Sequence, residues 1–392
     1  MKPFESQPFD IPASFLGRPY AEQHFIQIVR YAFAHNPFYQ QFLAAGSAVP
    51  LLTREILQEH NDEILNGQPV TGKTSGSTSI PVRIHWAQPR SRMDSRDSKN
   101  YAEWFGGQLP HMKIVALTAH KGADNTLEVA SPVCEQVPFI RQQIAEKGVR
   151  SLISYPTNLE QLAQHLVQTG EQIIELQRIV CMSELFEPSQ EAVIKQAFPN
   201  AHIAATYSST ELGMIAGRCP HYPDNYHIMA HKLGLEFLDE QGNPCAEGEV
   251  GQIVITDYYN HKMPLIRYAI GDLAAPITCP CGKIPLPALT KLLGKQRGIL
   301  KHPNGSHVFS TELSADIRDT PGIRQFQVIQ HALEHIQIRL IARPNAKTVD
   351  AEKNIRAVFV AIFGQSMHIE FDWCHEIPRL AGGKYMEFIG LR

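Results

Sequence analysis

Apolar residues recur at helical spacing over the first part of the chain. The stretch 20–45 shows this spacing, with Ile28, Val29 and Ala32 among its apolar positions, and it continues over 53–65. Residues three and four positions apart share one face of a helix, so the pattern predicts amphipathic helices. We therefore expect the chain to open with helices.

The following region alternates short apolar runs with longer helical patterns. The apolar runs are 114–117, 151–154 and 178–182, and helical spacing occurs over 158–169 and 189–198. Strands that alternate with helices are typical of a layered α/β domain. The large N-terminal part is therefore predicted to belong to the α/β fold class.

A pattern with a period of two follows this region. Over residues 233–256 two alternating runs flank glycine-containing segments at 241–243 and 247–249. Such segments favour tight turns, so we expect an antiparallel β subdomain here. Beyond a boundary at 293–297 the pattern is strand, helix, paired strands, helix and strand, which predicts a small α+β unit.

Length and composition narrow the class of protein. With 392 residues the chain exceeds one average domain, so we expect two domains, 1–293 and 294–392. Its 19% charged residues and net charge of -3 lack the basic excess that nucleic-acid binding needs. No segment approaches the ~20 apolar residues that cross a bilayer, and the N-terminus lacks the apolar run of a signal peptide. We expect a cytoplasmic protein that binds neither nucleic acid nor membranes.

The cysteines point to a reducing environment. There are seven, an odd number, and most are scattered, which suits reduced thiols better than a disulfide framework. Only Cys279 and Cys281 lie close together in the sequence.

Residues 67–74, GQPVTGKT, fit the phosphate-loop pattern of P-loop nucleotide-binding proteins. That loop works between a buried strand and the N-terminus of a helix. Here the preceding segment is charged and helical, and the following segment contains Pro81 and alternating β-branched residues that favour a strand. The P-loop hypothesis is therefore weaker than a loop that begins at Thr74.

A loop rich in hydroxyl groups starts at that position and consists of Thr74, Ser75, Gly76, Ser77 and Thr78. Its hydroxyls and backbone amides can surround a polyphosphate without adding fixed charge. A solvated Ser/Thr loop is the simpler alternative, and the composition of this segment alone favours it. The other motifs argue for a phosphate loop.

A run of small residues leads into Tyr207, Ser208, Ser209, Thr210 and Glu211. We expect an apolar strand that ends in this polar tip, because α/β folds bind ligands at the carboxyl edge of their sheets. A carboxylate at this edge suits Mg²⁺, which combines few protein oxygens with phosphate oxygens. The alternative is a helix N-cap at Ser208 or Ser209 with Glu211 in the first turn, and the local pattern alone favours it.

Asp272 follows an apolar run and is predicted to lie in a Gly-Asp turn after Gly271. A carboxylate in such a turn can accept both hydroxyls of a ribose. The alternative is an aspartate that caps its own backbone, which is common in turns.

These motifs belong to a longer ordered series. The series is TSGST (74–78), SYPTNLEQLA (154–163), CMSELFEP (181–188), YSSTE (207–211), PLIRYAIGDL (264–273), LLGKQRG (292–298) and IPRLAGGKY (377–385). By these motifs, in this order, the chain resembles the adenylate-forming superfamily of acyl-CoA synthetases, peptide-synthetase adenylation domains and luciferases. Within it the chain resembles the phenylacetate-CoA ligase branch and its deazaflavin-coenzyme adenylylating relatives.

The resemblance implies a two-step reaction. ATP and a carboxylic acid give an acyl-adenylate and pyrophosphate, and a thiol then takes the acyl group. Residues 1–293 would be the adenylate-forming core, and 294–392 a mobile lid that carries Lys384 to the charge developing at the α-phosphate. Gly382 and Gly383 would give this lysine mobility, whereas a surface lysine in a C-terminal tail is the alternative.

The resemblance also implies a set of nucleotide contacts. The implied nucleotide-binding residues are Thr74, Ser75, Gly76, Ser77, Thr78, Ser183, Glu184, Tyr207, Ser208, Thr210, Asp272 and Lys295. Of these, the loop 74–78 would hold the β- and γ-phosphates, Asp272 would hold the ribose, and Lys295 would lie at the hinge of the lid. Glu211 would hold Mg²⁺ and is, with Lys384, an implied catalytic residue.

Several positions depart from the family pattern. Ser79 stands where the phosphate loop has glycine, the basic residue expected nearby is displaced to Arg83, and Ala269 replaces an arginine. Lys295 stands where arginine is usual and lacks its planar fork, and Arg297 occupies the place of the usual hinge acid. Weak activity, an unusual acceptor and loss of the thiol step are therefore open alternatives.

Some members of the resembled branch carry a metal knuckle, and Cys219, His227, Cys279 and Cys281 match it. Thiolates and imidazole suit a closed tetrahedral Zn²⁺ site, which would tie the loop after YSSTE to the loop after GDL. His221 is an alternative to His227, because CPH mirrors CPC in spacing. Two reduced cysteines near a turn are the alternative, and we favour the zinc site.

We therefore expect an AMP-forming acid-thiol ligase that uses ATP, Mg²⁺ and an aromatic or other small organic acid. Coenzyme A and an acyl carrier protein are both open as thiol partners, and a homodimer is an open assembly. One rival is an adenylyltransferase that transfers AMP to a cofactor without a thiol step. The other is a non-catalytic binding or scaffold protein of the same fold.

Overall fold

The computed structural model describes residues 22–44, 49–74, 81–105, 113–119, 122–295, 299–309, 313–343, 348, 350–379 and 385–391. Within these ranges, no helix combines the length and the apolar character needed to cross a membrane.

The described part of the chain opens with the helices α1 (Glu22–His35), α2 (Pro37–Ala44), α3 (Arg54–Glu59) and α4 (Asn61–Leu65). Thr53 is the N-cap of α3, and its side chain accepts a hydrogen bond from the amide of Ile56. Asn66 ends α4 in a left-handed conformation with φ of 46°. The predicted helical opening is confirmed over the described residues.

Strands and helices then alternate. The strands are β3 (Ile114–Thr118), β4 (Thr126–Glu128), β5 (Ser151–Ser154), β6 (Arg178–Cys181) and β7 (His202–Ser209), and the helices are α6 (Val133–Lys147), α7 (Pro156–Thr169) and α8 (Pro188–Ala197). These strands pair in parallel in the order β4-β3-β5-β6-β7, and the prediction of a layered α/β region is confirmed.

The same sheet continues beyond β7 with antiparallel strands. They are β8 (Gly213–Arg218), β9 (Tyr226–Ile228), β10 (Leu233–Leu238), β11 (Gly251–Asp257), β12 (Tyr268–Ile277) and β13 (Ala288–Lys295). The 11-stranded sheet has the order β10-β11-β12-β13-β9-β8-β7-β6-β5-β3-β4. Leu233 pairs with Asp257, so the antiparallel strands predicted over 233–256 are confirmed. The end of β7 lies where the parallel and antiparallel halves meet.

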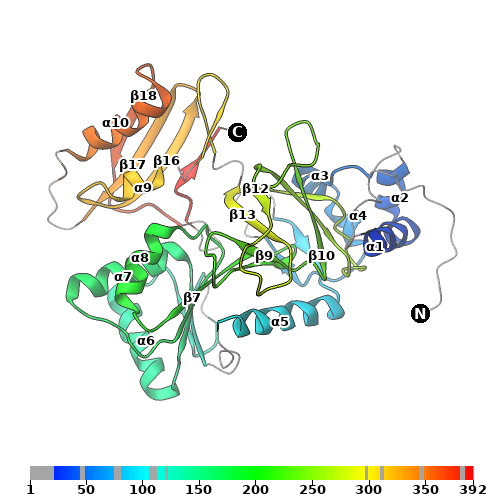
Figure 1. Cartoon of the computed structure of the whole chain (residues 1–392), viewed down its shortest axis with the longest axis horizontal. Coiled ribbons are helices and arrows are strands. Elements are labelled where there is room, and N and C mark those ends of the chain that lie inside the picture. The colour runs from blue at the N-terminus through cyan, green and yellow to red at the C-terminus, as the bar shows by residue number, and fades with distance from the viewer. Residues whose placement is uncertain are drawn as a thin grey trace.

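Two further elements flank this sheet. Helix α5 (Gln88–Glu103) lies along the antiparallel half, where the Tyr101 hydroxyl donates to the carbonyl of Ala205 at 2.7 Å (Figure 1). The short strands β1 (Gly72–Lys73) and β2 (Arg83–Ile84) form a separate antiparallel pair.

The C-terminal part has its own sheet. Its elements are β14 (Leu300–Lys301), β15 (His307–Val308), α9 (Ser314–Arg318), β16 (Ile323–Ala332), β17 (His335–Ala342), α10 (Ala351–Phe363), β18 (His368–Trp373) and β19 (Phe388–Ile389). β14 pairs with β15, and the four-stranded sheet has the order β18-β17-β16-β19. The predicted order of strand, helix, paired strands, helix and strand is confirmed.

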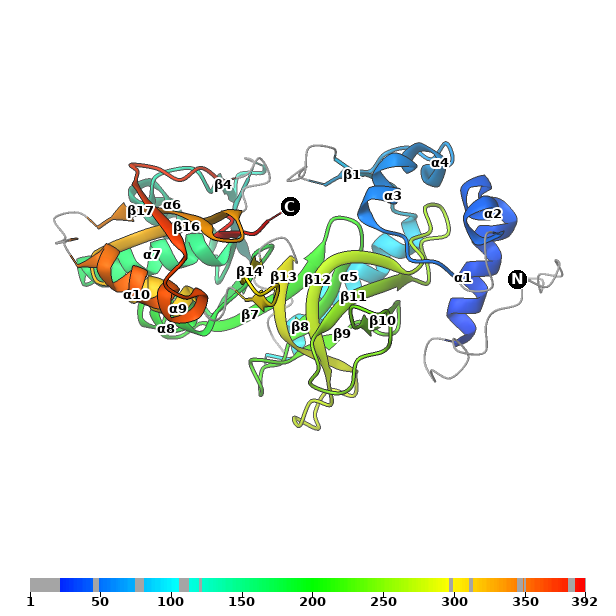
Figure 2. The same ribbon diagram turned by 90° about the horizontal axis from the view of Figure 1, so that it is seen from above.

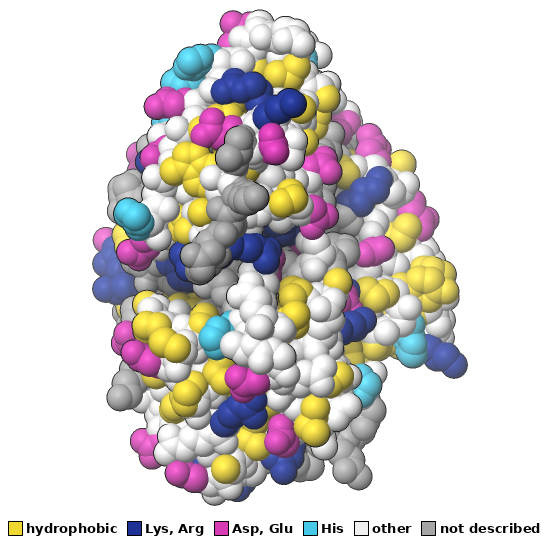
Figure 3. Space-filling view, turned by 90° about the vertical axis from the view of Figure 1, so that its left-hand side faces the viewer, with side chains coloured by type: hydrophobic (Ala, Val, Ile, Leu, Met, Phe, Trp, Pro, Cys, Tyr) yellow, Lys and Arg dark blue, Asp and Glu magenta, His cyan; other side chains and the backbone are white. Residues whose placement is uncertain are grey.

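Two large hydrophobic cores lie on either side of residues 289–300. One contains buried residues from Phe25 to Leu289, and the other contains buried residues from Leu300 to Phe388. The C-terminal part lies over α7 and α8 at one end of the molecule, and α1 and α2 lie at the other end (Figures 1 and 2). Figure 3 views the molecule from the left-hand side of Figure 1, where the C-terminal part lies above the α6–α8 region. Lys and Arg side chains are visible where the two regions meet.

Candidate functional site

Glu211 lies in the turn between β7 and β8. Its side chain is 5% exposed, and its Oε1 accepts hydrogen bonds from Arg54 Nη1 at 2.9 Å and from the Tyr268 hydroxyl at 3.3 Å. Because β7 and β8 form a hairpin, the alternative of a helix capped by Ser208 or Ser209 is wrong. A buried carboxylate needs a counter-charge, and Arg54 supplies it.

Arg54 connects Glu211 to the beginning of the predicted phosphate loop. It is the first residue of α3, and its Nη2 donates to Thr74 Oγ1 at 3.4 Å. The same Thr74 oxygen accepts from the amide of Val82 at 2.9 Å. Arg54 Nε is buried and has no hydrogen-bond partner within the part of the chain that the structure describes. A buried donor of this kind is costly unless a further acceptor reaches it.

Helix α5 supports the turn that carries Glu211. The guanidinium of Arg90 donates to the carbonyl of Leu212 and, through Nε, to Asp257 at 2.6 Å. Asp94 accepts from the amide of Met214 at 2.9 Å. Two side chains from one helix therefore hold the residues that directly follow Glu211.

Asp272 lies inside β12 and not in a turn, which corrects the prediction. Gly271 has φ of 81°, but the ladder continues beyond it because Asp272 pairs with Lys295 of β13. The Asp272 side chain is buried, and its Oδ2 accepts from the Tyr207 hydroxyl at 2.7 Å. Burial and the neighbouring Asp272 carboxylate raise the pKa of Tyr207 well above its ordinary value, so the hydroxyl remains a donor.

Ser183 and Glu184 lie in the loop between β6 and α8. Ser183 has φ of 67°, which is uncommon for a residue other than glycine. Glu184 Oε2 accepts from the hydroxyl of Thr157 at 2.7 Å and from its amide at 3.1 Å. Burial raises the pKa of Glu184, while Arg379 opposes this effect.

Glu184 also contacts the C-terminal part. Its Oε1 accepts from the amide of Tyr385 at 2.6 Å and from Arg379 Nη1 at 3.2 Å. Tyr385 directly follows Lys384 in the sequence. The loop that the resemblance assigns to the nucleotide is therefore also the loop on which the C-terminal part rests.

Arg54 links Thr74 to Glu211, and Tyr268 donates to the same Glu211 carboxylate. The Tyr207–Asp272 pair lies near enough for the charge of Glu211 to help raise the pKa of Tyr207. Thr210 is exposed. It lies beside β1, because a Cβ added at Gly72 of that strand would be 3.8 Å from Thr210 Cγ2. Predicted residues that lie outside the described residues are Ser75, Gly76, Ser77, Thr78 and Lys384, together with the departures Ser79 and Arg297.

The P-loop alternative does not fit the observed elements. Helix α4 precedes the GQPVTGKT segment, and Gly72 and Lys73 form β1 instead of the start of a helix. The next helix that the structure describes, α5, begins only after β2. The geometry of a P-loop therefore does not form around Lys73.

A cluster of Cys219, His227, Cys279 and Cys281 lies between β8, β9 and the loop after β12. One ligand atom from each residue lies within 4.8 Å of all the others. The Sγ atoms of Cys219 and Cys279 are 3.8 Å apart, and Cys281 Sγ is 3.5 Å from His227 Nε2. Cys219 and Cys279, which are 60 positions apart in the chain, thus meet in one small volume.

This cluster has the dimensions of a tetrahedral zinc site. Zn–S bonds of about 2.3 Å in a tetrahedron place two sulfurs about 3.8 Å apart. His227 Nδ1 lies 3.2 Å from the carbonyl of Leu286, a second contact of the kind that orients a ligating imidazole and leaves Nε2 for a metal. His221 is exposed and not part of the cluster, so His227 is the histidine that the fold places there.

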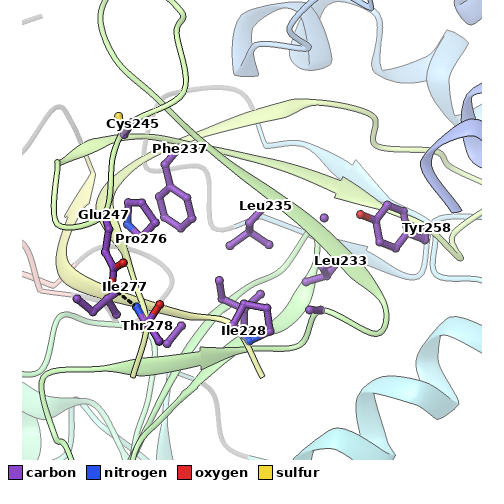
Figure 4. A pocket seen from close by; sticks show the side chains of 14 residues that line it. Ile228, Leu233, Leu235, Phe237, Cys245, Glu247, Tyr258, Pro276, Ile277 and Thr278 are labelled. Atoms are coloured by element: carbon purple, nitrogen blue, oxygen red, sulfur yellow. Dashed lines mark hydrogen bonds between the residues drawn. The ribbon is translucent and has the colours of Figure 1, made fainter. Parts of the chain in front are cut away.

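A separate apolar cavity of about 420 Å³ lies in the antiparallel half of the sheet. Figure 4 shows Leu235 and Phe237 of β10 together with Pro276 and Ile277 of β12 around it. None of the predicted nucleotide-binding residues that the structure describes lines this cavity. It is therefore distinct from the site around Glu211.

The predicted site residues also contact four residues that were not among the expected ones: Arg54, Tyr268, Thr157 and Arg379. Three of them lie inside motifs of the ordered series, Thr157 in 154–163, Tyr268 in 264–273 and Arg379 in 377–385, so motif membership was a usable signal. Arg54 carried no such signal, because a Thr-Arg pair at the start of a helix is ordinary capping chemistry.

Comparisons with known proteins agree with this architecture. Residues 300–389 match the family model of the CapK C-terminal domain. A phenylacetate-coenzyme A ligase of Thermus thermophilus is 24% identical to this chain over 443 aligned positions, which cover 96% of each protein.

Solved structures extend the likeness to the whole fold. The crystal structure of a 2-hydroxyisobutyryl-CoA ligase in the postadenylation state superposes with a TM-score of 0.73 at 15% identity, covering 97% of this chain and 89% of that one. The same ligase in its thioesterification state gives a TM-score of 0.56 at 16% identity, covering 97% and 90%. The chain is therefore similar to a phenylacetate-coenzyme A ligase along nearly its whole length, and it has the fold of the 2-hydroxyisobutyryl-CoA ligase.

Proposed function

We propose that this protein is an ATP-dependent, AMP-forming acid-thiol ligase. It would convert an aromatic or other small carboxylic acid into an acyl-adenylate and then transfer the acyl group to coenzyme A. The observation that carries the proposal is the meeting of Glu211, Arg54 and Thr74 at the end of β7, beside the Tyr207–Asp272 pair. The likeness to a phenylacetate-coenzyme A ligase along 96% of the chain supports the choice of acid and acceptor.

The groups at this site fit a nucleoside triphosphate. Arg54 Nε is a buried donor without a partner among the described residues, and a phosphate oxygen is the acceptor that suits a guanidinium best. The hydrogen bonds that the structure gives to Glu211 both end on Oε1, which favours Oε2 as the ligand of Mg²⁺. Mg²⁺, when bound, would neutralise charge on the phosphates.

The remaining nucleotide contacts stay proposals. Asp272, buried beside Tyr207, is proposed to accept the ribose hydroxyls. The other proposed contacts are Ser75, Gly76, Ser77, Thr78, Ser183, Glu184, Ser208, Thr210 and Lys295.

In the first step, a carboxylate oxygen of the acid attacks the α-phosphorus of ATP. A new O–P bond forms, the bond from the α-phosphorus to the bridging oxygen breaks, and pyrophosphate leaves with that electron pair. Arg54 and the loop 74–78 would hold the phosphates, and Lys384 would stabilise the charge on the α-phosphate. In the second step, a thiolate attacks the acyl carbon, a C–S bond forms, the bond from the acyl carbon to the phosphate oxygen breaks, and AMP leaves with that electron pair.

The lid and the metal cluster complete the proposal. The two hydrophobic cores support a core domain of residues 1–293 and a lid of residues 294–392. The higher TM-score against the postadenylation state supports assigning the described arrangement to the first step. We propose Zn²⁺ as the occupant of the cysteine and histidine cluster, and the cytoplasm as the location of a protein with reduced thiols.

Pyrophosphate release that depends on added acid tests the proposal. The purified protein is given Mg-ATP with a panel of aromatic and short acids, beginning with phenylacetate, with and without coenzyme A. We expect release with at least one acid, and a thioester in the mass spectrum when coenzyme A is present. ATP binding without release for any acid would favour the non-catalytic alternative.

An adenylyltransferase gives a different result. AMP would appear covalently bound to the second substrate, and neither coenzyme A nor an acyl carrier protein would accept an acyl group. Testing both thiols with the same acid separates these outcomes.

A further inference from the structure

Arg318 lies where the C-terminal part meets the core, and it binds carboxylates from both. It is the last residue of α9, and its side chain is 9% exposed. Its Nη2 donates to both carboxylate oxygens of Glu387, each at 2.6 Å. Its Nη1 donates to the carboxylate of Glu187 and, at 3.0 Å, to the hydroxyl of Ser189.

The carboxylates on the core side are themselves held in place. Glu187 is the N-cap of α8, and its own amide donates to Gln190 at 3.0 Å in a capping box. Ser314 of α9 donates to the same Glu187 carboxylate at 2.8 Å. Glu160 of α7 lies 3.9 Å from Arg318 Nε. One guanidinium from the C-terminal part is thus surrounded by acids from α7, from the start of α8 and from the segment before β19.

Glu387 relates this junction to the candidate site. It lies two residues after Tyr385, whose amide donates to Glu184 at 2.6 Å and whose hydroxyl donates to the carbonyl of Phe326 in β16. Two residues span only about 7 Å even when fully extended. A fixed Glu387 therefore restricts where the Tyr385 amide can lie relative to the Glu184 loop.

We propose that Arg318 is a positioning residue for the adenylation step. By binding Glu387 and Glu187 together, it holds the Tyr385 segment against the Glu184 loop of the core. The planar fork of arginine suits this role, because it can bind two carboxylates at once. Loss of the guanidinium leaves three acids together without a counter-charge, so the docked arrangement is lost while each part keeps its own core.

Hydrogen exchange tests the docking without reference to activity. In Arg318→Met, we expect the amides of residues 385–389 to exchange at least about tenfold faster than in the wild type, as for a broken buried pair. The matched control is Arg356→Met, an exposed arginine of α10 whose contacts, with Ile369 and Phe371, lie inside the C-terminal part. That control, and strands β17 and β18 in both variants, should keep wild-type exchange. Unchanged protection of residues 385–389 in Arg318→Met overturns the proposal.

The catalytic consequence rests on the proposed function and is tested by separating the two steps. With phenylacetate and Mg-ATP, Arg318→Met should release pyrophosphate at least about tenfold more slowly than the wild type. Thioester formation from supplied phenylacetyl-adenylate and coenzyme A should change less than about twofold. Glu187→Gln should likewise slow pyrophosphate release and spare thioester formation. Arg318→Lys should recover part of the rate of pyrophosphate release. Equal losses in both steps would mean a merely structural role and would overturn the assignment.

The two proposals fail in different ways. If the wild type releases no pyrophosphate with any acid, the proposed function fails. The exchange experiment then still decides whether Arg318 docks the C-terminal part.

Discussion

The guanidinium of Arg54 and the carboxylate of Glu211 lie 2.9 Å apart, although 157 positions separate them in the chain. The pair joins the opening helices to the turn after β7, and it lies beside Thr74. A cation and an anion are thereby fixed together at the carboxyl end of a central strand. Phosphates and the metal that accompanies them need both charges in one place.

The first prediction concerns Glu211. Glu211→Gln keeps the shape of the side chain but removes the charge that would hold Mg²⁺, so acid-dependent pyrophosphate release should fall by about 100-fold or more. The matched control is Glu55→Gln, an exposed acid next to Arg54 in α3, which should keep wild-type turnover. Full activity of Glu211→Gln would mean that this carboxylate has only a structural role.

The second prediction concerns the hydroxyl of Tyr207. Tyr207→Phe removes the donor that Asp272 accepts at 2.7 Å and leaves the ring in place. A hydrogen bond to a charged group orients it, so the KM for ATP should rise roughly 3–10-fold while kcat stays within about twofold. Tyr222→Phe, at an exposed tyrosine, is the control. An unchanged KM for ATP in steady-state kinetics would mean that Asp272 does not take part in nucleotide binding.

Local sequence patterns were sufficient for most helices and strands, because hydrophobic periodicity depends on neighbouring residues. The pairing of distant strands depends instead on residues that are far apart in the chain. Nothing local placed β7 between parallel β6 and antiparallel β8, and nothing local carried β12 through Asp272 to Ile277. The turn predicted at Asp272 was wrong for this reason, since the partner strand β13 extends the ladder.

The candidate site followed from the order of the motifs and not from any single one. The YSSTE segment alone favoured a helix cap, whereas the fold makes it the end of β7 and a hairpin turn. The contact between Glu184 and Tyr385 joins residues 201 positions apart, and no local pattern encodes such a contact. Arg54 and Arg318 were missed because each acts through partners from distant elements.

The third prediction concerns the metal cluster. Metal analysis should find about one zinc per chain, and Cys279→Ser should lose it. Because a structural metal stabilises the folded state, Tm should fall by roughly 5–10 °C in that variant or after chelation. Cys134→Ser, an exposed cysteine outside the cluster, should retain both the zinc and the Tm. A metal-free protein with an unchanged Tm would remove zinc from the proposal.

The fourth prediction concerns Lys384. Lys384→Ala should abolish acid-dependent pyrophosphate release, because in the proposed mechanism the charge at the α-phosphate would lose its cation. ATP binding, measured by calorimetry, should stay within a few-fold of the wild type, since the phosphate loop and Glu211 are intact. Lys353→Ala, at an exposed lysine of α10, is the control. Wild-type turnover of Lys384→Ala would exclude this lysine from the first step.

The fifth prediction is a pH dependence of docking that arises from Glu387. Burial raises the pKa of Glu387 to about 7, Arg318 opposes the shift, and Glu187 and Glu160 add to it. When the two parts separate, this carboxyl returns toward its ordinary pKa of about 4.3. The docked state therefore binds the proton more tightly than the separated state, so protonation of Glu387 stabilises docking. This stabilisation is fully present below pH 4 and is lost as pH rises through 7.

Between pH 6 and pH 8 this linkage should weaken docking by about tenfold, or about 1.4 kcal/mol. Small-angle X-ray scattering should then show a larger radius of gyration at pH 8, as more molecules separate. Glu387→Gln mimics the protonated carboxyl and should flatten the response. His307 lies 3.7 Å from Glu240 of the core, and His307→Asn removes this second contact between the two parts, so it is the control that keeps the Glu387 contribution. An undiminished pH response in Glu387→Gln would mean that another group binds the proton.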